Sequence, residues 1–160
     1  MIKLKDIKTP TTVEEFKENL KKYYFGYGKD ALYVKTQIEG ADGVTFDKIN
    51  SLNDVYKETK TGFGGDGSSP CISPMISKQS FDKMMDITVK NMFDKTINEE
   101  DLFKQMGDID VFDSTNDKER SSFMGNANPQ WIGLDNQVLR LFFAKTLGEF
   151  SGYQTNGSWS

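Results

Sequence analysis

The stretch "DNQVLRLFFAKTLGEF", residues 135–150, constrains the fold more than any other part of the chain. Its apolar side chains recur at the spacing of one helical face. Between Asp135, a suitable N-cap, and Glu149, only Arg140 and Lys145 are charged. A helix with so little polar surface must be covered, either by its own domain or by a partner. The apolar stripe consists of Leu139, Phe142, Phe143, Thr146, Leu147 and Phe150, and Val138 and Leu141 widen it.

Near the start of the chain, "TTVEEFKENLKKYYFG", residues 11–26, predicts another amphipathic helix. Thr12 can cap this helix, and Glu15 follows three residues later, as a capping box requires. Gly26 is expected to end it. The face expected to be buried carries Val13, Phe16, Leu20, Tyr23 and Tyr24.

Three further helices are predicted between these two. Apolar residues return at helical spacing within residues 47–60, 80–94 and 96–107. Thr96 and Glu99 form a second capping-box pattern at the start of the last of them.

Strand signals are weaker than helix signals. Residues 31–38 alternate apolar and polar side chains, and residues 108–112, "DIDVF", indicate a short strand. Residues 61–76 are rich in glycine and proline, and we expect Pro70 and Pro74 to prevent regular structure there. The predicted fold is α+β and predominantly helical, with about five helices and a small sheet. We expect a single domain, residues 1–160, in which the connector 61–76 joins an N-terminal α/β portion to a C-terminal helical portion.

The composition excludes several classes of function. The chain has 160 residues, no histidine, one cysteine and a net charge of −4. Chemistry that needs an imidazole, such as Ser-His-Asp catalysis or an HExxH zinc site, is therefore excluded, and so is an all-cysteine zinc site. No stretch gathers the lysines and arginines that would neutralise a run of phosphates, so nucleic acid is not expected as the main partner.

The sequence also bears on where in the cell the protein is expected to fold. No apolar run approaches the roughly 20 residues of a membrane span, and the N-terminal stretch lacks the pattern of a signal peptide. We therefore expect no membrane span and folding in the cytoplasm of the cell that makes the protein, with a virion as an alternative location.

The segment "GFGGDGSS", residues 62–69, comes close to a phosphate-binding loop. Gly62 and Gly67 have the required spacing, and Ser69 falls at the hydroxyl position. However, Ser68 replaces the essential lysine, and the preceding residues are polar instead of forming a buried strand. The segment is better interpreted as part of the connector.

An acidic segment, residues 108–119, resembles the calcium loop of an EF-hand in several positions. It departs from that loop where Phe112 replaces a ligand and Asp113 replaces the glycine of the sharp turn. A solvated acidic turn is the simpler interpretation, with weak Ca²⁺ or Mg²⁺ binding as the alternative and no other cofactor expected. The candidate ligands are Asp108, Asp110, Asn116 and Glu119.

Asp108 and Asp110 allow one more interpretation. Two carboxylates on one face of a strand can hold Mg²⁺ in phosphoryl-transfer enzymes. A Mg²⁺-dependent carboxylate enzyme is therefore one alternative function, although Asp-x-Asp arises easily by chance in a chain with 28% charged residues.

The tail, residues 151–160, is polar and aromatic and contains no charged side chain. We expect it to dock on this domain or on a neighbour, although its ending "GSWS" is also typical of a linker to an affinity tag. With no intact catalytic motif, the chain is expected to be a non-enzymatic interaction or assembly protein that binds other proteins or copies of itself, for example as a virion or phage structural component. A small acidic inhibitor or immunity-type protein that binds an enzyme is the alternative. The expected partner-binding residues are Tyr153, Trp159, Trp131 and Phe63.

Overall fold

The computed structural model describes residues 1–26, 49–52, 54, 72–91, 98–113, 116, 118 and 137–152. Its helices are α1 (Val13–Tyr23), α4 (Lys78–Asn91), α5 (Glu99–Met106) and α8 (Gln137–Leu147), with 3₁₀ turns η1 (Leu4–Asp6) and η3 (Gly148–Ser151). Its strands are β1 (Ile2–Lys3), β2 (Tyr24–Gly26), β3 (Ile72–Pro74) and β4 (Asp110–Val111). The expected class, α+β with helix predominating, is confirmed.

The number of helices differs from the expectation. Four α-helices are defined within the described residues, whereas about five were predicted. Of the helix expected at residues 47–60, the structure describes the beginning, where the Ser51 hydroxyl accepts a hydrogen bond from Asp54 N at 3.2 Å. Ile49 and Leu52 are buried there, so this segment contributes to the core through its first turn.

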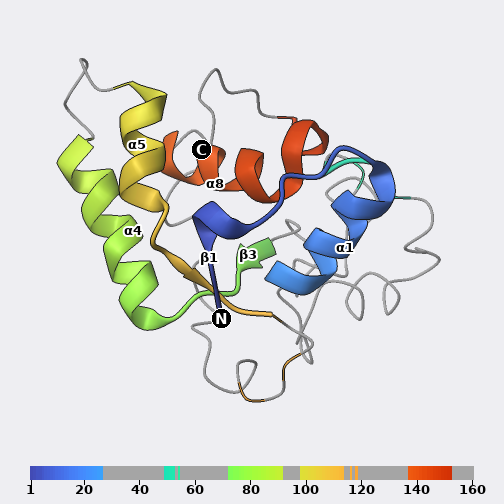
Figure 1. The fold of residues 1–160 in the computed structure, drawn as a ribbon, viewed down its shortest axis with the longest axis horizontal. Coiled ribbons are helices and arrows are strands. Elements are labelled where there is room, and N and C mark those ends of the chain that lie inside the picture. Colours follow the sequence, from blue (N-terminus) through green and yellow to red (C-terminus); the bar gives the residue numbers. More distant parts are fainter. Residues whose placement is uncertain are drawn as a thin grey trace, which may run out of the picture.

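Helix α8 lies at the centre of the fold. Figure 1 shows it running between the α4–α5 pair on one side and α1 on the other, with the N-terminal segment passing across it. α8 contacts α1, α4, α5 and η1. Its side chains from Val138 to Leu147 are buried except for Arg140. The chain itself therefore covers the apolar helix that the sequence predicted.

Helix α1 begins as expected and ends earlier than expected. Thr12 caps it, and the Thr12 hydroxyl accepts from Glu15 N at 3.2 Å. The helix ends at Tyr23, and Tyr24 is extended, with φ −131° and ψ 153°. Gly26 does not stop the helix, because residues 24–26 form β2 instead. Tyr24 gains core contacts in this position: its ring stacks on Phe143, with centroids 5.7 Å apart.

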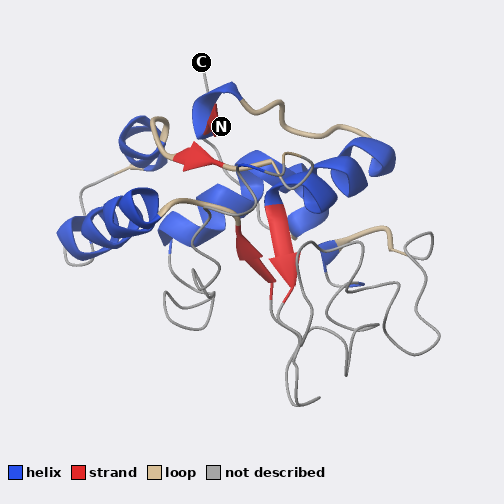
Figure 2. Cartoon of the chain, turned by 90° about the horizontal axis from the view of Figure 1, so that it is seen from below, coloured by secondary structure: helices blue, strands red, loops and turns tan. Residues whose placement is uncertain are grey.

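The strands form two small antiparallel sheets, which Figure 2 shows in red. β1 pairs with β4, so that Ile2 faces Val111. β2 pairs with β3, so that Tyr24 faces Pro74. An antiparallel bridge between Ile76 and Val111 links the two sheets. The short strand predicted in "DIDVF" is confirmed as β4, whereas the strand expected at residues 31–38 lies outside the described residues.

The end of the expected connector is structured. Residues 72–74 form β3 despite the presence of Pro74, and Met75 and Ile76 are fully buried. Pro74 is compatible with β3 because β3 belongs to a two-stranded sheet and is an edge strand, where a missing N–H is tolerated. The expectation that prolines exclude regular structure was therefore wrong at Pro74. Residues 61–71, including Phe63, lie outside the described residues.

Helix α5 begins at a different cap from the one predicted. Asn98 is its N-cap, and the Asn98 side chain accepts from Asp101 N at 2.9 Å. Thr96 lies outside the described residues. Glu99 is the first helical residue instead of the third that a capping box with Thr96 would require. Asn98 is a preferred capping residue in its own right, so the sequence offered two competing helix starts.

The core is one hydrophobic cluster that includes residues from η1, α1, α4, α5, β4 and α8. The two expected portions of the chain therefore share a core within the described residues. No helix in these ranges is long and apolar enough to cross a membrane. The largest fully buried side chains are Tyr24, Phe16, Phe142, Phe143, Leu4, Ile7, Leu20, Ile49 and Leu52.

Candidate functional site

Backbone hydrogen bonds join the N-terminal segment to residues 107–112, the stretch that contains β4 and the candidate ligands Asp108 and Asp110. Leu4 N donates to Ile109 O at 2.9 Å, and Lys5 N donates to Gly107 O at 3.0 Å. On the other side of the same strand, Phe112 N donates to Met75 O at 2.6 Å. Residues 107–112 are therefore held by backbone hydrogen bonds from both sides, which fixes where their side chains project.

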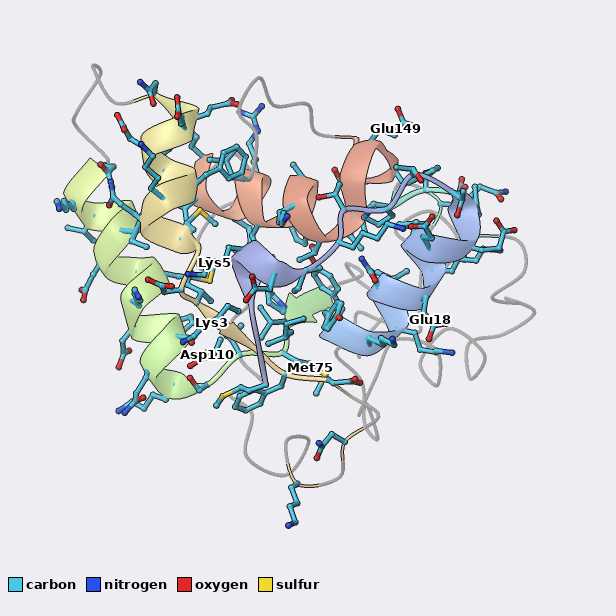
Figure 3. All side chains as sticks on the ribbon, viewed as in Figure 1. Lys3, Lys5, Glu18, Met75, Asp110 and Glu149 are labelled. Carbon is cyan, nitrogen blue, oxygen red and sulfur yellow. The ribbon has the colours of Figure 1, made fainter. Side chains whose placement is uncertain are left out.

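Asp108 and Asp110 each contact a lysine from the N-terminal segment, as Figure 3 shows for Lys3 and Asp110. Lys3 Nζ lies 2.8 Å from Asp110 Oδ1, and Lys5 Nζ lies 3.1 Å from Asp108 Oδ1. Lys3 Nζ also donates to the carbonyl oxygen of Asp108 at 3.3 Å. The two carboxylates that the sequence offered to a metal ion are thus neutralised by ammonium groups.

These contacts alter the proton affinities of the groups involved. The hydrogen bond and charge of Lys5 lower the pKa of Asp108, and more distant Lys83 and Lys3 act in the same direction. The hydrogen bond that Lys3 donates to Asp110 raises the pKa of Lys3, with the charges of Asp110 and Asp108 adding to the effect. Both shifts favour the charged forms of Asp108 and Lys3.

Of the four candidate metal ligands, three lie in the described residues: Asp108, Asp110 and Asn116. Asp108 and Asp110 face lysines, whereas Asn116 lies beyond β4 and its Oδ1 accepts from Lys118 N at 3.1 Å. Glu119 lies outside the described residues. Across those residues, no group of three or more His, Cys, Asp or Glu side chains is arranged to hold a metal ion. Weak Ca²⁺ or Mg²⁺ binding stays a prediction, and it would require the displacement of Lys3 and Lys5.

A pocket of about 200 Å³ opens beside this strand. Its walls come from three parts of the chain: the start of the N-terminal segment, the end of α1 and the residues after β4. Asn116 N donates to Asp113 O at 3.1 Å, which joins the two lining residues that follow β4. The lining residues are Met1, Ile2, Tyr23, Asp113 and Asn116.

The surroundings of Tyr23, which lines this pocket, alter the proton affinity of its phenol. Burial raises the pKa of Tyr23 most strongly, and the charges of Asp113 and Glu18 raise it further. The phenol is therefore neutral at physiological pH and can exchange hydrogen bonds. Because the Asp113 charge influences the Tyr23 hydroxyl, the two groups lie within electrostatic range of each other. A neutral phenol, a carboxylate and an amide can together recognise a cation or a hydrogen-bond donor.

Sequence patterns did not single out Tyr23 or Asp113 as binding residues. Tyr23 was assigned to the apolar stripe of a helix, and it is indeed 9% exposed. Asp113 stood at the glycine position of the calcium-loop pattern. No local signal could reveal the pocket, because β1 and the residues after β4 meet only when the strands pair. Of the earlier candidates that the structure describes, Asn116 contributes to it.

Other buried polar groups stabilise the core. The Tyr24 hydroxyl hydrogen-bonds with Thr146 Oγ1, which in turn donates to Phe142 O at 2.9 Å. Asn19 Nδ2 donates to Thr146 O at 2.9 Å and ties α1 to α8. Lys145 is only 7% exposed, and burial lowers its pKa while the charge of Asp6 opposes that change.

The expected partner-binding residues cannot be compared with this pocket. Tyr153, Trp159, Trp131 and Phe63 all lie outside the described residues. Of the tail 151–160, the structure describes Ser151 and Gly152, which end η3. No protein-family model, curated protein or solved structure matches this chain.

Proposed function

We propose that this protein is a non-enzymatic interaction or assembly protein, and that the face around Met1, Tyr23 and Asp113 contacts its partner. The observation that carries this proposal is the pocket of about 200 Å³ on that face. Most small-molecule sites occupy roughly 300–1,000 Å³. A pocket below that range suits one inserted side chain better than a whole metabolite.

The rim of the pocket supports a role in protein contact. Met1 is 68% exposed and is one of two large hydrophobic side chains that are exposed among the described residues. Methionine adapts its shape to different surfaces and recurs at binding interfaces. An exposed apolar rim beside a polar pocket is an arrangement that a protein partner can cover, with the pocket supplying specificity.

The proposed partners are other proteins, including further copies of this chain in an assembly such as a virion or phage particle. The tail residues Tyr153 and Trp159 and the loop residues Trp131 and Phe63 are additional proposed contacts. Aromatic side chains are common in interface cores because they bury a large area with few rotatable bonds.

The native complex provides the test. The protein should be recovered from the cells that make it, in the cytoplasm or in particles, and the mass of the complex measured under native conditions. A complex larger than the 18.1 kDa chain supports the proposal. Replacing both Tyr153 and Trp159 with alanine should reduce that complex while the far-ultraviolet circular dichroism stays unchanged. Recovery of the monomer alone would contradict the proposal.

A second candidate function is a small acidic inhibitor or immunity-type protein. The net charge of −4 favours a basic partner surface. The salt dependence of binding separates the two candidates. An inhibitor that relies on charge should form a small complex that weakens steeply between low and high salt, whereas an assembly component should form large complexes that tolerate salt.

A further inference from the structure

We propose that the pocket beside β4 takes a tyrosine side chain of the partner protein, and that the Tyr23 hydroxyl forms a hydrogen bond with the hydroxyl of that side chain. This inference rests on the proposed function and specifies which part of the partner the site recognises. Its starting point is that Tyr23, a buried residue with a polar end, lines a pocket large enough for one side chain.

The Tyr23 hydroxyl makes no hydrogen bond within the ranges that the structure describes. Tyr23 is 9% exposed, and its backbone oxygen accepts from Met75 N at 2.9 Å. The neighbouring phenol differs, because the Tyr24 hydroxyl bonds with Thr146. A buried polar group without a partner costs free energy, which a ligand recovers when it supplies the missing hydrogen bond. The group that enters the pocket should therefore carry a hydrogen-bonding atom.

The charges in the pocket wall favour a neutral occupant. The described lining residues contribute one cationic group, the amino group of Met1, and one carboxylate, that of Asp113. Both residues already interact with other groups of the chain. Because the two opposite charges offset each other, an incoming ion would be desolvated without a counter-charge of its own, which is costly. A neutral side chain with a polar end avoids this cost.

The volume of the pocket fits one aromatic ring. An apolar protein cavity of about 150 Å³ holds a benzene molecule, so the volume of about 200 Å³ leaves room for a ring and its hydroxyl. Met1 and Ile2 supply apolar surface for the ring, and contacts between a thioether and an aromatic ring are favourable. Phenylalanine would fill the same space but leave the Tyr23 hydroxyl unpaired, whereas tyrosine supplies a hydroxyl that both donates and accepts.

The local backbone keeps the walls of the pocket in place. Met75 N donates to Tyr23 O at 2.9 Å, and Phe112 N donates to Met75 O at 2.6 Å. This relay connects the end of α1 to the residue before Asp113 through the residue that follows β3. Because the walls are linked by backbone hydrogen bonds, little conformational freedom is lost when a side chain enters the pocket.

A solution titration of the isotopically labelled full chain tests the specificity of the pocket. The probe is Nα-acetyl-tyrosine amide, and Nα-acetyl-phenylalanine amide has nearly the same shape without the hydroxyl. We expect saturable NMR shifts at the amides of Asp113 and Asn116 with the tyrosine probe, and binding of the phenylalanine probe that is roughly fivefold weaker. Equal binding of the two probes, or no shift at these amides at up to about 50 mM tyrosine probe, would overturn the inference.

Variants tie this preference to the Tyr23 hydroxyl. In Tyr23→Phe the two probes should bind about equally, because the hydroxyl that distinguishes them is gone. Tyr24→Phe is the matched control, since it removes the neighbouring phenol hydroxyl, which contacts Thr146 in the core. It should keep the roughly fivefold preference for the tyrosine probe.

Two results with these variants would contradict the assignment. An unchanged preference in Tyr23→Phe would show that its hydroxyl does not bind the probe. Equal loss of preference in both variants would show that the preference does not come from the pocket. Unchanged chemical shifts of core residues far from the substituted ring show that each variant is folded.

The native complex separates failure of this inference from failure of the proposed function. If Tyr23→Phe holds the natural partner as tightly as the unaltered chain does, the pocket does not take a tyrosine side chain of that partner, and the interaction function stands. If the unaltered chain has no protein partner, the proposed function fails and the inference fails with it. Weaker binding of the partner by Tyr23→Phe, with full binding by Tyr24→Phe, supports both.

Discussion

Lys3 Nζ lies 2.8 Å from Asp110 Oδ1, and the same two residues face each other across the β1–β4 pair. The ion pair and the strand register therefore reinforce one another. They bring the N-terminal segment against the strand that leads to Asp113, and in this way they place Met1 and Ile2 at the pocket. The candidate site thus depends on a contact between distant parts of the sequence.

The ion pair of Asp108 predicts a particular response to acid. Lys5 lowers the pKa of Asp108 below its ordinary value of 3.8. A depressed carboxyl pKa gives stability that is present above the unfolded-state pKa and is lost as pH falls through the lower, folded-state value. Asp108→Asn should therefore reduce the dependence of Tm on pH below about pH 4. Thermal unfolding between pH 2 and pH 6 measures this effect, and Asp82→Asn on α4 serves as the comparison. The same dependence of Tm on pH in the unaltered chain and in Asp108→Asn would show that the Asp108 ion pair does not contribute to stability.

Tyr23 should titrate at higher pH than an ordinary tyrosine. Burial raises its pKa above 10.0, with Asp113 and Glu18 adding to the shift. Because the folded state holds this proton more tightly, the associated stability is complete below pH 10 and is lost as pH rises through the folded-state pKa. Asp113→Asn should lower the pKa of Tyr23 without returning it fully to 10.0, since burial remains. NMR signals of the Tyr23 ring, followed between pH 8 and pH 12, report its pKa in the unaltered chain and in Asp113→Asn. Identical titration curves of Tyr23 in the two proteins would show that Asp113 has no influence on it.

The buried hydroxyl of Thr146 should contribute measurably to stability. Its hydrogen is donated to Phe142 O, so in its contact with Tyr24 it acts as the acceptor. Thr146→Val keeps the shape and removes that acceptor, and we expect a loss of about 1–3 kcal/mol in the free energy of unfolding. Thr88→Val is a matched control, because the half-buried Thr88 hydroxyl also donates to a helix carbonyl, Met84 O, at 2.9 Å. Denaturant unfolding should show a smaller loss in the control, and equal losses would contradict a special role for the contact with Tyr24.

Gly148 should be difficult to replace for two reasons. Its φ is +65°, and an added Cβ would lie 2.6 Å from Pro10 O. Gly152 has a similar φ of +82° with nothing within 4 Å of an added Cβ. Both alanine variants would hold an L residue in the left-handed region, where its Cβ crowds the backbone, at a cost of about 1–2 kcal/mol. Gly148→Ala should lose about 1–3 kcal/mol more than Gly152→Ala, measured by denaturant unfolding. Equal losses would mean that the N-terminal segment moves aside at little cost.

Calcium or magnesium binding can be tested at the residues that the sequence suggested. A divalent ion would have to replace Lys3 and Lys5 at Asp110 and Asp108. We therefore expect no saturable NMR shift at the Asp110 amide when calcium or magnesium is added to millimolar concentration. The weakest calcium sites of proteins have dissociation constants in this range. Removing both lysine charges, in Lys3→Met with Lys5→Met, should increase any ion binding. Saturable binding by the unaltered chain would instead support the metal-site alternative.

Local sequence patterns determined the helical part of the fold. The apolar period of residues 135–150 predicted a covered helix, and α8 (Gln137–Leu147) is covered on nearly all sides. Thr12 capped α1 as predicted, because a capping hydrogen bond joins residues only three positions apart. The short strand at Asp110–Val111 was also predicted from its own residues. In these places the interacting groups are neighbours in the sequence, so the pattern contains the relevant information.

Tertiary contacts decided the remaining features. The helical period placed Tyr24 in the helix at the start of the chain. In the structure Tyr24 belongs to β2, and its hydroxyl contacts Thr146, which is 122 positions away in the sequence. Pro74 became part of a strand because that strand pairs with β2. Lys3 and Asp108 are 105 positions apart in the sequence, and no periodicity indicates that they meet. The sequence by itself determined the helices and their apolar faces, whereas strand pairing between distant segments decided where helix α1 ends, which lysines neutralise the acidic segment and where the pocket forms.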